Sequence, residues 1–84
     1  MDKTVLFDIE EIQNASIKET LKEVYEALKE KGYNPINQIT GYIITSDPGY
    51  ISNYKDARNK ITSIDRTELV ALLIKDYLKI KWEY

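Results

Sequence analysis

Basic side chains that could bind a phosphate or a carboxylate are concentrated in one stretch of the chain. Lys55, Arg58 and Lys60 lie two or three residues apart, and Arg66 follows closely. Such groups donate charge-assisted hydrogen bonds, and an arginine can bind both oxygens of an anion at once. Arg58, Lys60 and Arg66 are therefore candidate contacts for a phosphate or a protein partner. Alternatively, they belong to a solvated helix surface on which the arginine stems cover apolar neighbours.

A hydroxyl group that an enzyme could modify lies near the N-terminus. Thr4 stands between Lys3 and Val5, in a region where chains are usually accessible. A phosphate on Thr4 would add about 1.5 to 2 negative charges. The plainer interpretation is an exposed threonine without a role, because modified threonines are rare among terminal ones.

Residue types that usually carry catalysis or bind metals are absent. The chain contains no histidine and no cysteine, which removes the commonest general base, thiolate nucleophiles and thiolate zinc ligands. It also lacks a G-x-x-x-x-G-K-[ST] phosphate loop and paired metal ligands. We therefore expect no enzymatic activity, no cofactor and no metal site. A pocket with clustered titratable residues would contradict this expectation.

Length and charge narrow the function classes further. The 84 residues, 43% hydrophobic and 31% charged, predict one small globular domain. The net charge of -2 argues against a nucleic-acid-binding protein. A helix-turn-helix module that reads DNA through residues 54–60 is kept as the alternative function. No apolar run approaches the roughly 20 residues that span a bilayer, and no secretion signal is visible. We expect a cytoplasmic protein without membrane insertion.

Turn-forming residues organise the chain, since all three glycines and both prolines fall within residues 31–50. Gly32 predicts the end of one helix, and Asn34 followed by Pro35 predicts the start of the next. A short buried helix should follow and end at residues 46–49. Its expected apolar face carries Ile36, Ile39 and Ile43.

The N-terminal part divides into two predicted segments. Val5, Phe7 and Ile9 alternate with other residues, which is typical of extended backbone. We predict an extended N-terminal arm over residues 1–14 that carries Thr4. Ser16 and Glu19 then have the spacing of a capping box, so the first long helix is expected to begin there. Residues 15–84 should form a helical dimerisation domain.

Two more helices are expected after the turns. One should contain Tyr54, Ala57, Ile61 and Ile64 and be capped by Ser52 or Asn53. Asp65 predicts the start of a last helix of about 14 residues, because aspartate is a favoured N-cap. Trp82 and Tyr84 either pack on a partner or belong to a frayed tail.

The last helix is apolar on nearly all sides, with an unbroken apolar run over residues 69–74. A chain of this length has few elements to cover such a helix, so we infer a two-fold homodimer. Alternatively, it is the central core helix of a monomer. The predicted interface residues are Leu69, Leu72, Leu73 and Tyr77. The predicted fold is all-α, a small homodimeric bundle of about four helices with an extended N-terminal arm.

Several motifs resemble one known family. EKGYNPINQITGYIITSDPGYI (residues 30–51), with DARNKI, DRTELV and the opening DKTVLF, closely resembles the IreB/ReoM family of small bacterial regulatory phosphoproteins. The resemblance spans residues 2 to about 78, and the GYNPINQI string is unusually specific. Arg58 and Arg66 match recurring family arginines, whereas Asn53 and Thr62 stand where members often have a basic residue.

The resemblance implies a function that the residues alone do not give. It implies a helical homodimer that is a substrate of a membrane Ser/Thr kinase with extracellular PASTA repeats. The family's phosphoacceptor lies in a D-x-T-hydrophobic setting near the N-terminus, which only Thr4 matches. The family regulates cell-envelope homeostasis and cell-wall antibiotic tolerance in Gram-positive bacteria. The proposed route is turnover of a peptidoglycan precursor enzyme by Clp protease, so both are implied partners.

Overall fold

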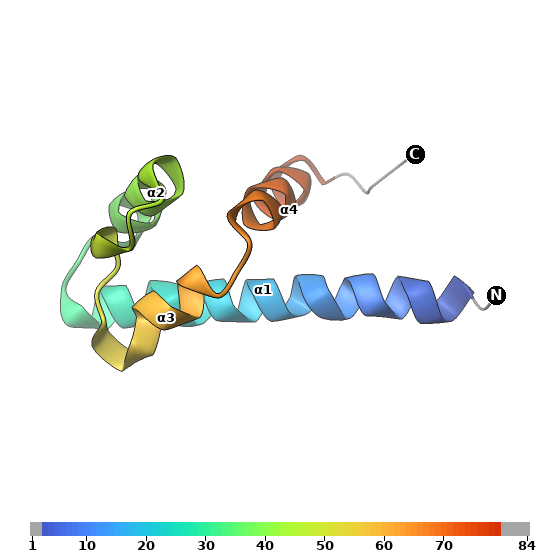
Figure 1. Ribbon diagram of the computed structural model, residues 1–84, viewed down its shortest axis with the longest axis horizontal. Helices are drawn as coiled ribbons and strands as arrows, with labels where there is room; N and C mark the ends of the chain where they lie inside the picture. Colours follow the sequence, from blue (N-terminus) through green and yellow to red (C-terminus); the bar gives the residue numbers. More distant parts are fainter. Residues whose placement is uncertain (1–2, 80–84) are drawn as a thin grey trace.

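The computed structural model describes the backbone of residues 3–79 and the side chains of residues 12–79. Trp82 and Tyr84 lie outside this part. The elements in chain order are the helices α1 (Lys3–Lys31) and α2 (Pro35–Thr45), the 3-10 turns η1 (Pro48–Tyr50) and η2 (Tyr54–Asp56), and the helices α3 (Ala57–Thr62) and α4 (Arg66–Leu78). This confirms the all-α class for the described residues. α1 runs along the whole molecule, with α2 and α4 on the same side of it (Figure 1).

The prediction of an extended arm over residues 1–14 is wrong from Lys3 onward, where the backbone is helical. No glycine or proline interrupts the chain before Gly32, so nothing breaks a helix there. Val5, Ile9 and Ile12 also recur at intervals of four and three residues. This helical spacing coexists with the alternation that suggested an extended segment.

The predicted helix start at Ser16 is also wrong. Ser16 and Glu19 lie inside α1, where each backbone N–H is hydrogen-bonded to a carbonyl of the preceding turn and needs no cap. The capping-box spacing is therefore incidental here. α1 passes without a break through the domain boundary that we placed between residues 14 and 15.

The predicted turns are confirmed by the cap contacts. Gly32 has a φ of 101°, a backbone conformation that glycine adopts at little cost. The side chain of Asn34 accepts a hydrogen bond from the backbone N–H of Asn37 at 3.1 Å. Asp65 accepts from the N–H groups of Thr67 and Glu68 at 2.8 and 3.1 Å. These bonds satisfy donors that every helix start leaves free.

The predicted apolar face of α2 is confirmed at two of its three positions. Ile39 is buried and Ile43 packs against the core, but Ile36 is 62% exposed and Tyr42 is buried instead. The ring of Tyr50 lies where a Cβ on Gly41 would be, within 2.5 Å of it. A larger residue at position 41 would therefore displace this ring, which helps to hold η1 against α2.

The third predicted helix is broken near its start. Residues Tyr54–Asp56 form the short turn η2, and α3 begins only at Ala57. The break has a local cause, since Lys55 and Asp56 both have left-handed backbone with φ values of 52° and 64°. Ser52 caps this turn, because its hydroxyl accepts a hydrogen bond from Tyr54 N at 3.1 Å. Asn53 makes no side-chain cap bond.

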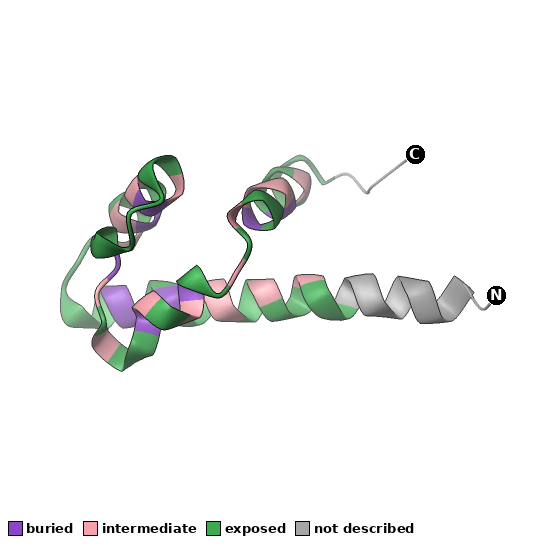
Figure 2. Cartoon of the chain, viewed as in Figure 1, coloured by how far each residue is buried: buried purple, intermediate pink, exposed green. Residues whose placement is uncertain are grey.

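The hydrophobic core lies at the C-terminal half of α1, where α2, α3 and the intervening loop pack against it (Figure 2). Burial of these apolar side chains is the main stabilising contribution to such a fold. No helix within residues 3–79 is long and apolar enough to cross a membrane. The buried cluster consists of Val24, Ala27, Leu28, Ile39, Tyr42, Ile51, Ala57 and Ile61.

Candidate functional site

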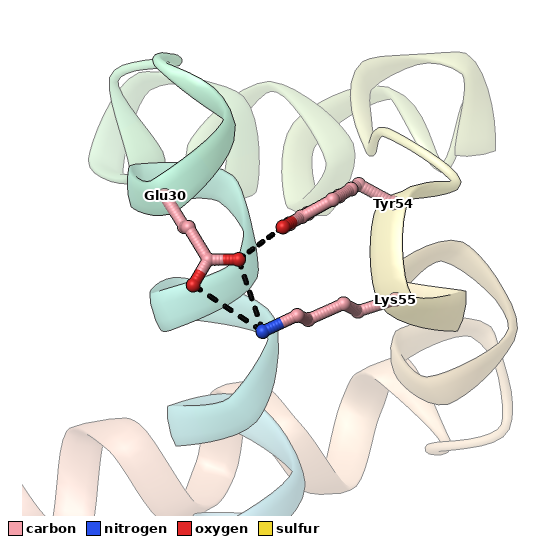
Figure 3. Close-up of polar contacts among 3 residues, drawn as sticks. All are labelled: Glu30, Tyr54 and Lys55. Carbon is pink, nitrogen blue, oxygen red and sulfur yellow. Dashed lines mark hydrogen bonds and ion pairs between the residues drawn. The ribbon is translucent and has the colours of Figure 1, made fainter.

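A polar cluster fastens the strained turn η2 to the end of α1. The Tyr54 hydroxyl donates a hydrogen bond to Glu30 Oε1, and Lys55 Nζ lies 3.0 Å from Oε1 and 3.2 Å from Oε2 (Figure 3). The ammonium groups of Lys31 and Lys55 also lie over the Tyr54 ring, 5.3 and 5.6 Å from its centroid. Glu30 therefore accepts from two residues that follow it by more than 20 positions.

These contacts change the acidity of all three groups. The hydrogen bond from Tyr54, followed by that from Lys55, lowers the pKa of the Glu30 carboxyl below its ordinary value. The hydrogen bond to Glu30 raises the pKa of both Tyr54 and Lys55. Each shift favours the protonation state that the cluster needs at neutral pH. At neutral pH the Glu30 carboxyl is therefore ionised, whereas Tyr54 and Lys55 are protonated. None of the three groups is shifted toward a pKa near 7, so the contacts of the cluster persist at neutral pH.

The cluster coincides with the least favourable backbone in the described part of the chain. Two consecutive non-glycine residues in the left-handed region, Lys55 and Asp56, cost on the order of 1 kcal/mol or more each. Asp56 Oδ1 accepts a hydrogen bond from Asn59 at 2.9 Å, while Lys55 is held by Glu30. These contacts offset the strain and fix the direction in which α3 leaves the turn.

Replacing Glu30 by glutamine should destabilise the protein at neutral pH but not in acid. Because the folded pKa of Glu30 is lowered, its contribution is present above the unfolded value of about 4.5 and is lost as pH falls through the folded pKa. The difference in melting temperature between the wild type and Glu30→Gln should therefore shrink from pH 7 to pH 3. The control is Glu26→Gln, whose carboxylate has no ion pair in the described part. A Glu30→Gln difference that does not shrink between pH 7 and pH 3 would contradict the assignment.

The two predicted arginine contacts bind backbone within the chain. Arg58 Nε donates to the carbonyl oxygens of Pro48 and Ile51 at 3.2 and 3.0 Å, and Arg66 Nη1 donates to Ile43 O at 3.2 Å. Arg58 thereby fastens the loop between α2 and α3. Within the described part each guanidinium uses one nitrogen for these bonds, so both keep donors for an external anion.

Lys60 has an internal partner as well. Its Nζ lies 3.1 Å from Glu23 Oε1, an ion pair that joins α3 to the C-terminal half of α1. Nothing here supports the helix-turn-helix alternative. The expected reading segment, residues 54–60, is not one helix, and its Lys55 and Lys60 already pair with carboxylates.

Thr4 lies in the first turn of α1, and its side chain is outside the described part. It is far from Lys60 of its own chain. At about 1.5 Å per residue, Thr4 and Glu23 are about 28 Å apart along α1, and Glu23 is the partner of Lys60. A phosphate on Thr4 could therefore meet Arg58 or Lys60 only on another molecule.

One face of α4 is an apolar stripe that its own chain leaves uncovered. Leu69 and Leu72, two of the predicted interface residues, are 0% and 7% exposed within the single chain, so they have little surface to offer a partner. The uncovered side chains recur at the spacing of one helix face. This α4 stripe consists of Leu73 (38% exposed), Ile74 (52%), Tyr77 (84%) and Leu78 (56%).

The comparison with protein families decides the relationship of this chain to known proteins. A family model described as IreB regulatory phosphoprotein matches residues 2–79. The chain belongs to the IreB family. This confirms the resemblance found in the sequence and places the protein among regulatory phosphoproteins.

Sequence reasoning missed two features of this IreB-family protein. The cluster around Glu30 joins residues far apart in the sequence, and no local pattern signals such a contact. Ile74 and Leu78 were not among the predicted interface residues, although they lie three or four residues from Tyr77 or from each other along α4. Their exposure could not be read from the sequence, because Leu69 and Leu73 are neighbours on the same helix surface and only Leu69 is fully buried.

Proposed function

We propose that this protein is a cytoplasmic substrate of a PASTA-type Ser/Thr kinase and relays that kinase's signal to cell-envelope homeostasis in a Gram-positive bacterium. The match of residues 2–79 to the regulatory phosphoprotein family carries the proposal. No part of the proposed role requires catalysis by the chain itself. Its function is to change partners or conformation when a phosphate is added.

Thr4 is the proposed phosphoacceptor. It follows Asp2 and Lys3 and precedes Val5, which is the D-x-T-hydrophobic setting of the family. Its place in the first turn of α1 gives the modification a physical consequence. Backbone N–H groups are unpaired at a helix start and favour negative charge, and the first turn of α1 contains no acidic residue. A phosphate there should stabilise the N-terminal turns of α1.

The protein is proposed to act as a homodimer through the α4 stripe. Its four large apolar side chains lie together on one helix face, and a soluble monomer rarely leaves such a patch uncovered. A second copy carries the same surface, so in a two-fold symmetric dimer the stripe of each copy would cover the stripe of the other. In this proposal Leu73 and Tyr77 are interface residues, whereas Leu69 and Leu72 are buried within the single chain and are not.

The downstream partners are proposed from the family resemblance. They are the Clp protease machinery and a peptidoglycan precursor enzyme whose turnover sets cell-wall antibiotic tolerance. Arg58, Lys60 and Arg66 are the proposed contacts to a partner. The spare guanidinium donors of Arg58 and Arg66 suit a phosphate or carboxylate, while Lys60 would first have to leave Glu23.

Exchanging Thr4 for alanine in the chromosomal gene tests this function. If Thr4 is the only target through which the kinase acts on this pathway, Thr4→Ala cells should match kinase-deficient cells in their tolerance of cell-wall antibiotics. The matched control is Thr67→Ala, which alters another exposed threonine and should leave tolerance at the wild-type level. Thr4→Ala cells with wild-type tolerance, at unchanged protein abundance, would contradict the proposal.

A further inference from the structure

α2 carries a row of side chains that its own chain leaves uncovered. Ile36, Thr40 and Ile44 follow one another at intervals of four residues, so they lie along one side of the helix. All three are exposed, and Ile36 and Ile44 each expose more than half of their surface. The buried residues Ile39 and Tyr42 lie on a different side of α2. We call Ile36, Thr40 and Ile44 the α2 row.

The surroundings of the α2 row are uncharged. Residues 32–46 contain no Asp, Glu, Lys or Arg, although 31% of the whole chain is charged. Charged and polar residues normally occupy the solvent side of a surface helix. Single exposed isoleucines are ordinary, but two on one side of a helix, within an uncharged stretch, are typical of a surface that binds another molecule.

A cationic group lies at the C-terminal end of the α2 row. Arg66 Nη1 donates a hydrogen bond of 3.2 Å to the carbonyl oxygen of Ile43, and the peptide bond of this carbonyl leads to Ile44. Within the described part of the chain the guanidinium uses one nitrogen for this contact, so other donors remain for a carboxylate. An occupant of the row should therefore be apolar along its length and carry a carboxylate at the end that meets Arg66.

The shape of the α2 row favours a helical occupant. Side chains four residues apart form a ridge, and such a ridge packs into the groove between the corresponding rows of another helix. From Ile36 to Ile44 the ridge is about 12 Å long, or roughly two helical turns. A partner helix with apolar side chains three or four residues apart would cover both isoleucines at once.

A second copy of this chain does not fit this description. In an antiparallel pair of α2 helices, Arg66 of each copy would meet the N-terminal half of the other α2, which contains no carboxylate. In a parallel pair the two helix dipoles would lie side by side in the same direction, which is unfavourable. The α4 stripe also offers a second copy more large apolar side chains. The occupant is therefore expected to be a helix of a different protein.

We propose that the α2 row is a docking surface for an amphipathic helix of a partner protein. Ile36 and Ile44 contact its apolar side chains, and Arg66 binds a carboxylate near one of its ends. This inference rests on the proposed function, because a regulator that acts without catalysis acts through the proteins it binds. It adds to Arg66, one of the proposed partner contacts, the apolar surface beside it. The row lies outside the α4 stripe, so each copy in the dimer can bind one partner.

Photocrosslinking in living cells tests whether the α2 row is occupied. p-Benzoylphenylalanine replaces the exposed Ile44, and the crosslinked peptides are identified by tandem mass spectrometry. We expect an adduct with a segment of another protein that carries apolar residues three or four positions apart and an Asp or Glu. The same group in place of Glu26, an exposed residue of α1, should not give this adduct. No adduct at position 44, an adduct with a second copy, or a segment without a carboxylate would overturn the inference.

A synthetic peptide with the sequence of the crosslinked segment then tests the individual contacts. Its binding to the full-length chain is measured by isothermal titration calorimetry. Ile44→Glu should weaken binding roughly 10-fold or more, whereas Ile12→Glu, which alters an exposed isoleucine of α1, should leave it unchanged. Arg66→Glu should also weaken binding, and a peptide with Lys in place of its carboxylate should restore it. Wild-type affinity of Ile44→Glu, or no restoration by the charge-reversed peptide, would overturn the inference.

This test is separate from the test of the proposed function. Thr4→Ala cells with wild-type tolerance would contradict the kinase pathway, but an adduct of the expected kind at position 44 would still support the docking surface. If Thr4→Ala cells match kinase-deficient cells and position 44 gives no adduct, this inference alone is overturned.

Discussion

Replacing Tyr77 by glutamate is expected to weaken the proposed homodimer and favour the monomer. Tyr77 is the most exposed member of the α4 stripe, at 84%, so the substitution costs the single chain little. In the dimer it would remove a large apolar contact and bury an unpaired charge. We expect dimerisation to weaken roughly 100-fold, about 2.8 kcal/mol. Sedimentation equilibrium over a dilution series measures the dissociation constant.

The matched control for this substitution is Ile36→Glu. Ile36 is also a large exposed apolar residue, at 62%, but it lies on α2 and outside the stripe. This variant should dimerise like the wild type. Equal weakening by both substitutions would show that added charge matters and the position does not. If Tyr77→Glu dimerised as the wild type does, the α4 stripe would not be part of the interface.

Ile61→Ala is expected to have the largest effect on stability. Ile61 is fully buried between α3 and α1, and its truncation leaves a cavity that costs about 3 kcal/mol in comparable cores. α3 has only six residues, too few to be helical without tertiary contacts. The loss should therefore detach α3 as well as weaken the core. Urea unfolding followed by circular dichroism measures the free energy of unfolding.

Ile44→Ala serves as the comparison for this core substitution. Ile44 is 76% exposed on α2, so losing its side chain should change the free energy of unfolding by no more than about 0.5 kcal/mol. Equal losses at Ile44 and Ile61 would mean that Ile44 is covered in solution. A loss below about 1 kcal/mol at Ile61 would show that α3 does not depend on this contact.

Local signals predicted three helix ends, those set by Gly32, Asn34 and Asp65. The caps of α2 and α4 depend on Asn34 and Asp65 alone, and side chains of these types bind the free backbone donors wherever a helix starts. Gly32 likewise ends α1 because of its own conformational freedom. Such features depend on residues a few positions apart, so the sequence displays them directly.

The remaining features depend on contacts or on competing patterns. Val5 and Ile9 fit both an alternating and a helical spacing, and the absence of a breaker before Gly32 favoured the helix. The left-handed backbone at Lys55 accompanies a contact with Glu30 that lies 25 residues away. No sequence pattern near Lys55 indicates that contact. The sequence therefore predicted candidate residues such as Thr4 and Arg58 from their own chemistry or from the family resemblance. It did not predict the cluster around Glu30.

Mapping the phosphate on the wild-type protein is the most direct test of the proposed role as a kinase substrate. The purified chain would be incubated with ATP and the cytoplasmic domain of a PASTA-type kinase, the proposed modifying enzyme, and then analysed by tandem mass spectrometry. We predict one phosphate per chain, located on Thr4. Phosphate on other serines or threonines with Thr4 unmodified, or no phosphate on the chain, would contradict the account.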